Sequence, residues 1–233
     1  MSDTKTAEKK PSQANLLHPD NREHSHSVCW NCEKKIGDED VCPSCVRVQP
    51  FGPERDYYSI LGLPARLTLD PRLLVAAYHE KSRTFHPDHH VEDSEKEQTI
   101  ALGNASLVNL AFRTLRDPFL RAHYFIGHVK GEPARPNRKA VLSSSDLMEI
   151  MDLKEERDAL LASQGPAVAE QRLRAVIDPI EQEIYHSFEE IDALVDGSED
   201  GREKLSKALA TLSERLEKRA YLQNLLKEIR EAS

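Results

Sequence analysis

The residues best suited to chemistry are four cysteines near the start of the chain. Cys29 and Cys32 form one C-x2-C pair, and Cys42 and Cys45 form a second pair after nine intervening residues. Each pair can present two sulfur atoms from one tight turn to a tetrahedral metal ion. Four thiolates suit zinc, and a fully ligated ion keeps no open position for a substrate. We therefore predict a structural Zn²⁺ site in a small separate module at residues 29–52.

The cysteine pattern is a strong signal for metal binding and a weak signal for function. Redox sensing or iron transfer is the alternative to a structural role, but no base lies beside the four cysteines. A DNA-reading finger would normally bring a basic helix. Residues 33–47 carry only three basic side chains against four acidic ones. We therefore expect no nucleic-acid partner.

A second candidate group is His86-Pro87-Asp88, where proline ends a helix and displays an imidazole and a carboxylate. The tripeptide alone is a weak signal, because His18-Pro19-Asp20 repeats it without any flanking helical pattern. Helical patterns flank the second copy on both sides. One begins at the capping pair Asp70-Pro71, and another runs from about residue 94 to 116. An antiparallel hairpin with the tripeptide at its tip is expected.

The helix that leads to the tripeptide has two distinct faces. At 100° per residue, its apolar side chains fall on one arc and its basic side chains on the opposite arc. The expected core residues are Leu73, Leu74, Ala77, Tyr78 and Phe85, and the basic face consists of Arg72, His79 and Arg83. Without the loop motif, this basic face would be interpreted as an ordinary solvated surface.

The context of the tripeptide resembles a J domain over residues 55–127. The resemblance depends on the sequence DYYSILG at residues 56–62, the basic helix before the loop, and NLAFRTLRDP at residues 109–118. It implies that the basic face and His86, Pro87 and Asp88 dock on the ATPase domain of a DnaK-type chaperone. It also implies that the protein triggers ATP hydrolysis there and is an activator, not an enzyme. The J domain would occupy residues 53–130.

A linker at residues 131–145 leads to a helix N-cap expected at Ser144 or Ser145. Helical patterns then cover about residues 145–163, 167–196 and 201–230, with Pro179 expected to kink the middle helix. Short connections favour an antiparallel three-helix bundle at residues 146–233. This region has 12 basic and 21 acidic side chains, so it holds the negative charge of the chain.

The first helix of this bundle has more apolar residues than one core stripe can use. Leu147, Met148 and Met151 occupy a second arc, beside Asp152 and Glu155. In the last helix, Tyr221 and Leu225 are expected to point away from the core stripe. An exposed apolar patch rimmed by carboxylates is typical of a protein-binding site. Packing of these side chains beneath the J domain is the alternative.

A J domain followed by this acidic bundle resembles the HscB family of iron-sulfur co-chaperones over residues 55–230. Leu147-Met148-Glu149 and Tyr221-Leu222 carry the closer likeness, and the cysteine pairs are similar to those of the mitochondrial members. The family binds the cluster scaffold IscU and delivers it to the chaperone HscA to promote cluster transfer. The resemblance places six residues on the scaffold-binding face: Leu147, Met148, Met151, Asp152, Glu155 and Tyr221. Met151 stands where leucine is common, and Tyr221 where phenylalanine is common.

A general J protein for another client is the second interpretation, although such proteins typically continue into Gly/Phe-rich and β-rich regions that this sequence lacks. The 233 residues carry a net charge of -8 and no apolar run of the roughly 18 to 20 residues that span a membrane. Residues 1–28 are polar and are expected to be a disordered tail without a secretion signal or presequence. The expected protein is all-α and located in the bacterial cytoplasm, with the mitochondrial matrix disfavoured.

Overall fold

The computed structural model describes residues 28–131, 142–195 and 201–231. Within these ranges the chain forms seven α-helices and one 3-10 turn, and its only extended pairing consists of two isolated bridges near the cysteines. The predicted all-α fold is therefore confirmed. The expected tail, except for Val28, and most of the expected linker lie outside the described residues. No helix in the described ranges has the length and apolar content needed to cross a bilayer.

The contacts of the chain divide it into two compact units. The first comprises Met1–Ala65 and Leu69–Arg116, and the second comprises Arg66–Thr68 and Asp117–Ser233. The elements of the first unit are α1 (Tyr57–Leu61), α2 (Pro71–Thr84), the 3-10 turn η3 (Pro87–His89) and α3 (Glu95–Arg116). The elements of the second are α4 (Pro118–Val129), α5 (Ser144–Ser163), α6 (Pro166–Val195) and α7 (Arg202–Glu231).

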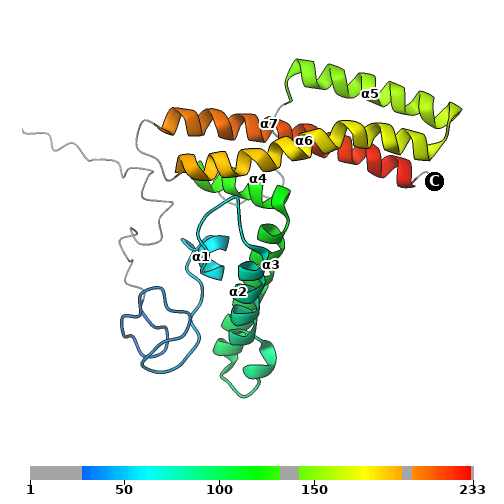
Figure 1. The fold of residues 1–233 in the computed structure, drawn as a ribbon. Coiled ribbons are helices and arrows are strands. Elements are labelled where there is room, and N and C mark those ends of the chain that lie inside the picture. Colours follow the sequence, from blue (N-terminus) through cyan, green and yellow to red (C-terminus); the bar gives the residue numbers. More distant parts are fainter. Residues whose placement is uncertain (1–27, 132–141, 196–200, 232–233) are drawn as a thin grey trace, which may run out of the picture. The chain divides into compact units, whose positions relative to one another are not determined.

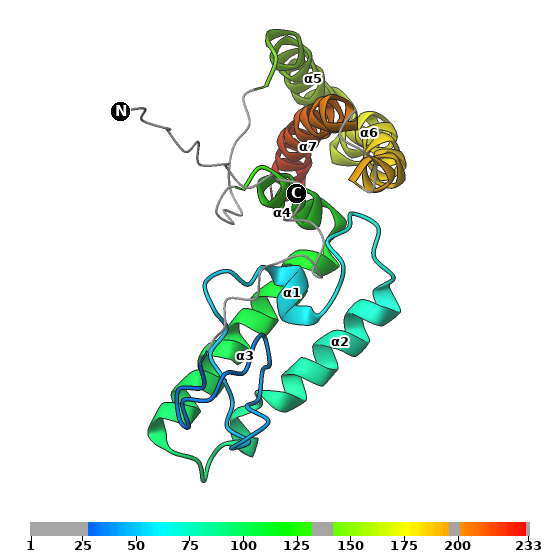
Figure 2. The same cartoon turned by 90° about the vertical axis from the view of Figure 1, so that its left-hand side faces the viewer.

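Local signals set the helix ends of the first unit. Asp56 forms a capping box with Ser59 at the start of α1, and Gly62 ends that helix with φ 67°. Asp70 caps α2, whose first residue is proline. Helices α2 and α3 then run side by side as a hairpin, and α1 packs against both (Figure 2).

The hairpin core uses a narrower arc of α2 than the sequence predicts. Leu74 and Phe85 are buried, whereas Leu73 is 62% exposed, so its predicted core position is wrong. One residue along a helix is a rotation of 100°, and α3 covers only the arc that Leu74 and Phe85 share. Across this arc the ring of Tyr78 stacks on Phe112, with 4.1 Å between centroids.

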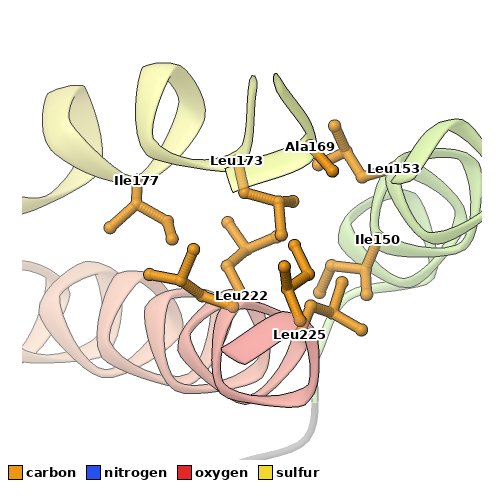
Figure 3. Packing of buried hydrophobic residues seen from close by; sticks show 9 residues of the cluster. Ile150, Leu153, Ala169, Leu173, Ile177, Leu222 and Leu225 are labelled. Carbon is orange, nitrogen blue, oxygen red and sulfur yellow. The ribbon is translucent and has the colours of Figure 1, made fainter. Parts of the chain in front are cut away.

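In the second unit, α6 and α7 lie alongside each other, and α5 covers one end of the pair (Figure 1). The core at that end is closed by buried side chains from all three helices (Figure 3). It consists of Ile150, Leu153, Ala169, Leu173, Ile177, Leu222, Leu225, Leu226 and Ile229. Helix α4 packs against α7 and contributes the buried side chains Ala122 and Phe125.

One helix end and one core position differ from expectation. Ser143, not Ser144 or Ser145, caps α5, and its hydroxyl accepts from the Asp146 N–H at 3.1 Å. Helix α6 contains Pro179 in its interior and packs along α7, and the kink expected at this proline stays a prediction. Leu225 is 7% exposed and belongs to the core, so the prediction that it points outward is wrong.

Candidate functional site

The His86-Pro87-Asp88 loop lies at the tip of the α2–α3 hairpin. Helix α2 ends at Thr84, and His86 is the N-cap of η3, where its Nδ1 accepts from the Asp88 N–H at 3.3 Å. None of the three loop side chains is buried. The turn therefore exposes an imidazole, which can carry a positive charge, together with a carboxylate. The proline prevents helix α2 from continuing through this turn.

The basic face of α2 lies before this loop. Arg72, His79 and Arg83 are all exposed, and the Arg72 side chain is 95% exposed. Asp70 is the nearest carboxylate to Arg72 at 4.0 Å, a distance at which an exposed ion pair contributes little. Positive charge on this face is therefore available to an acidic partner.

The four cysteines converge as the sequence predicts. Their sulfur atoms all lie within 4.8 Å of one another, with Cys29 and Cys45 3.6 Å apart and Cys32 and Cys42 3.7 Å apart. Sulfur ligands about 2.3 Å from a tetrahedral zinc ion would be separated by about 3.8 Å. The donor set and its spacing therefore fit a four-thiolate metal site.

Two thiols of this cluster, Cys29 and Cys32, have pKa values shifted in opposite directions. Burial opposes ionisation of Cys29, but N–H groups of Cys32 and Asn31 and the thiols of Cys45 and Cys42 outweigh it and lower its pKa to about 6. The Lys34 N–H favours the Cys32 thiolate, yet burial and the three other cysteines raise the pKa of Cys32 to about 11. A divalent cation would favour thiolates at all four positions and release the remaining protons.

Two copies of one backbone turn hold the sulfur atoms. Each copy closes with an N–H from the first cysteine to a carbonyl five residues later, at 2.9 Å from Cys29 to Lys34 and from Cys42 to Arg47. The residue after each second cysteine, Glu33 or Val46, has a φ near 58°. The sequence shows no obvious repeat because only the valine and the cysteine spacing recur, in Val28-Cys29-x2-Cys32 and Val41-Cys42-x2-Cys45.

The cysteine module packs against the hairpin, a contact that the sequence analysis missed. Glu97 and Asn104 lie on the buried stripe of α3, and both bind the module. Glu97 accepts from Val48 N–H and Arg47, and Asn104 Nδ2 donates to the Gln49 carbonyl at 2.7 Å. A carboxylate and an amide on an otherwise apolar stripe are the signal that could have revealed this contact, since buried polar groups need partners.

The candidate scaffold-binding patch on α5 is exposed. Leu147, Met148 and Met151 are 48%, 67% and 57% exposed, and Asp152 and Glu155 beside them are also exposed. This surface is therefore not sealed inside the protein. Burial of α5 is confined to the opposite arc, which carries Ile150, Leu153 and Arg157.

Tyr221, the sixth predicted patch residue, comes from α7 and is 41% exposed. One turn before it, Lys218 Nζ lies 3.0 Å from Asp146 and 2.7 Å from Glu149, which flank Leu147 and Met148 on α5. A hydrogen bond from Ser143 and then the pairing with Lys218 lower the pKa of Asp146. These ion pairs join the start of α5 to the turn of α7 that precedes Tyr221.

No profile of a known protein family matches the chain. The co-chaperone protein HscB of Proteus mirabilis (strain HI4320) is 36% identical over 103 residues. Those residues are 44% of this chain and only 59% of that relative. Human co-chaperone protein HscB matches the structure with a TM-score of 0.68 and 23% identity, over 88% of this chain and 98% of the human chain. Chaperone HscB from Vibrio cholerae matches with a TM-score of 0.54 and 25% identity, over 76% of this chain and 97% of the other.

A helical hairpin with His-Pro-Asp at its tip, followed in the chain by a C-terminal helical bundle, is the fold that this protein shares with the solved HscB structures. The sequence match and both structural matches are to HscB proteins. The predicted resemblance to the HscB co-chaperone family is therefore confirmed, together with a four-cysteine cluster before the hairpin that can hold a metal.

Proposed function

We propose that this protein is an iron-sulfur co-chaperone that activates a DnaK- or HscA-type ATPase. The exposed loop of His86, Pro87 and Asp88 carries this proposal, because it presents its polar groups at the tip of the α2–α3 hairpin. The exposed basic face of Arg72, His79 and Arg83 supplies positive charge for an acidic surface on the chaperone. The protein itself contributes no catalytic step, and ATP is hydrolysed by the partner.

The C-terminal unit would bind an IscU-type cluster scaffold. Leu147, Met148 and Met151 offer apolar area in the centre of the patch, with Asp152 and Glu155 at its rim. Interfaces commonly combine an apolar centre with a polar rim, and a few central side chains supply most of the affinity. Tyr221 on α7 is 41% exposed and would extend the apolar area. Holding the scaffold while activating the ATPase would promote cluster transfer.

A structural Zn²⁺ would be held by Cys29, Cys32, Cys42 and Cys45. The metal would stabilise two short turns that have few apolar residues of their own, since binding energy in such sites is folding energy. The bacterial cytoplasm is the proposed place of action, and the similar Proteus mirabilis protein is bacterial.

The decisive test is His86→Gln in the full chain. The substitution removes an exposed imidazole without creating a cavity, so we expect stimulation of the partner ATPase to disappear while scaffold binding is unchanged. Steady-state ATP hydrolysis by a purified DnaK- or HscA-type chaperone measures the effect. The matched control is His18→Gln, which alters the same tripeptide in the N-terminal region. Full stimulation by His86→Gln would contradict the J-type function.

The scaffold half is tested with Leu147→Ala plus Met151→Ala. Truncating two central apolar contacts should weaken binding to a purified IscU-type scaffold by about 2 kcal/mol or more, as hot-spot truncations do. Isothermal titration calorimetry measures the affinity, and ATPase stimulation should remain at the wild-type level. Leu102→Ala plus Leu110→Ala, at exposed positions of α3, is the control pair. Equal affinity of the double mutant and the wild type would place the scaffold site elsewhere.

A further inference from the structure

Arg47 of the cysteine module binds two carboxylates at the start of α3. Its Nη1 donates to Asp93 Oδ1 at 3.0 Å and to the Glu97 carboxylate. Glu97 is 2% exposed, and its other oxygen accepts from the Val48 N–H at 3.2 Å. A buried carboxylate without a cation would be strongly unfavourable, and Arg47 of the module supplies that cation to Glu97.

The second oxygen of Asp93 continues the chain of contacts. His90 Nδ1 lies 2.8 Å from Asp93 Oδ2, and His90 Nε2 lies 2.9 Å from the carbonyl of Thr84, the last residue of α2. A carbonyl and a carboxylate both accept, so this geometry requires both ring nitrogens to donate. His90, Asp93 and Glu97 could also bind a metal cation. Arg47, however, already pairs with both carboxylates of this group.

These contacts hold the base of the exposed loop. Thr84 precedes the loop and His90 follows it, and His89 Nδ1 also lies 2.9 Å from the Arg83 carbonyl. The turn η3 buries none of its own residues, so packing of its side chains does not set its orientation. The orientation depends on the groups that hold its two ends.

We propose that Arg47 is a positioning residue for the His86-Pro87-Asp88 loop. The path runs from the second cysteine turn through Asp93 and His90 to the end of α2. The cysteine module is then part of the chaperone-activating device, because it fixes the loop that contacts the ATPase. This inference rests on the J-type function proposed above.

The first cysteine turn offers an internal control. Lys34 occupies the position that Arg47 occupies in the second turn, since each carbonyl accepts the 2.9 Å bond that closes its turn. Lys34 is exposed, whereas Arg47 joins the module to α3. Lys34→Ala and Arg47→Ala therefore remove the same charge from equivalent positions.

The experiment compares ATPase stimulation by the zinc-loaded full chain and its variants. Arg47→Ala should raise the concentration needed for half-maximal stimulation about tenfold or more, the order expected when an orienting residue is lost. Maximal stimulation should be retained, because His86 and Asp88 are still present. Arg47→Lys should recover most of the loss, since Nζ can approach both carboxylates in place of Nη1. Lys34→Ala should behave as wild type.

A spectroscopic readout separates positioning from general stability. In ¹⁵N NMR spectra, the amides of His86 and Asp88 should shift in Arg47→Ala and not in Lys34→Ala. Asp93→Asn breaks the same path outside the module, so it should also raise the half-maximal concentration and shift the amides of His86 and Asp88. This variant tests the proposal even if Arg47→Ala folds poorly. If Arg47→Ala and Asp93→Asn both match Lys34→Ala, the inference is wrong and the J-type function stands. If the wild type stimulates no ATPase, the proposed function itself fails.

Discussion

The pKa of the buried His90 side chain depends on the charges of neighbouring residues. Burial lowers the pKa of His90, but its bonds to the Thr84 carbonyl and Asp93, with the charges of Asp93 and Glu97, raise the pKa above its usual value. Arg47 of the cysteine module pairs with Asp93, the carboxylate that His90 contacts. His123 in α4 has the opposite behaviour: burial lowers its pKa, and the charge of Arg219 adds to this effect against Glu217 and Asp117.

These opposite shifts predict opposite pH dependence of stability. Because the pKa of His90 is raised on folding, its contribution is fully present below about pH 6.5 and is lost as the pH rises through the folded value. His90→Gln should therefore lower the unfolding free energy most at acid pH. Fluorescence of Trp30, the single tryptophan, follows urea unfolding of the first unit between pH 5 and 8.

His123→Gln is the contrasting control for that experiment. A lowered pKa in the folded state makes the native histidine unfavourable below about pH 6.5, so removing it should help at acid pH. Far-UV circular dichroism follows the second unit. A pH-independent difference between the wild type and His90→Gln would contradict the assigned protonation of His90.

At the scale of elements, α6 and α7 are longer than the helix that covers them at one end. Helix α5 packs over the end that contains Leu173, and α4 packs against α7. The segment 66–68 joins this unit through Asp192 of α6, whose carboxylate accepts from the Leu67 and Thr68 N–H groups at 2.8 Å each. One acidic side chain thus anchors a segment that precedes it by more than a hundred residues.

Asp192→Asn should destabilise the second unit by about 1 to 3 kcal/mol, because the amide keeps one acceptor oxygen and places an NH₂ group against the other backbone N–H. Urea unfolding followed by far-UV circular dichroism measures the change. Glu189→Gln, an exposed neutralisation on the same helix, is the control and should leave stability within about 0.5 kcal/mol of wild type. Equal stability of the two variants would show that the carboxylate does not anchor the segment.

At the scale of the molecule, the two units carry different surfaces. The first holds the cysteine module, the basic face of α2 and the exposed loop. The second holds the apolar patch of Leu147, Met148 and Met151 on the acidic part of the chain. Each unit has its own buried core, so loss of one set of contacts should affect that unit first.

Zinc removal should therefore act on the first unit alone. The purified protein is expected to hold one zinc per chain, retained under mild oxidant, and chelation should expose the amides of residues 29–52 and of α3 to hydrogen exchange. The amides of α6 and α7 should keep their protection. Mass spectrometry of exchange, with zinc added back as the control, measures both. Unchanged exchange in residues 29–52 after chelation would contradict a structural metal.

Short-range signals in the sequence were sufficient for much of this architecture. Cysteine spacing predicted the converging sulfur atoms, Asp70-Pro71 predicted the start of α2, and the surplus apolar residues of α5 predicted an exposed arc. These features depend on periodicity and local backbone preference, which act within a few residues. The errors at Leu73 and Leu225 occurred where the width of a neighbouring helix contact decides burial.

The sequence by itself determined the helices, the pairing of the cysteines and the placement of His86 at a hairpin tip. Only the tertiary structure decided that Arg47 meets Asp93 and Glu97, some fifty residues later in the chain. The reason is physical: charged residues on a solvated surface follow no periodic spacing, so the sequence does not identify which opposite charge pairs with Arg47. Its partner is selected by the folded surface that buries the opposite charge.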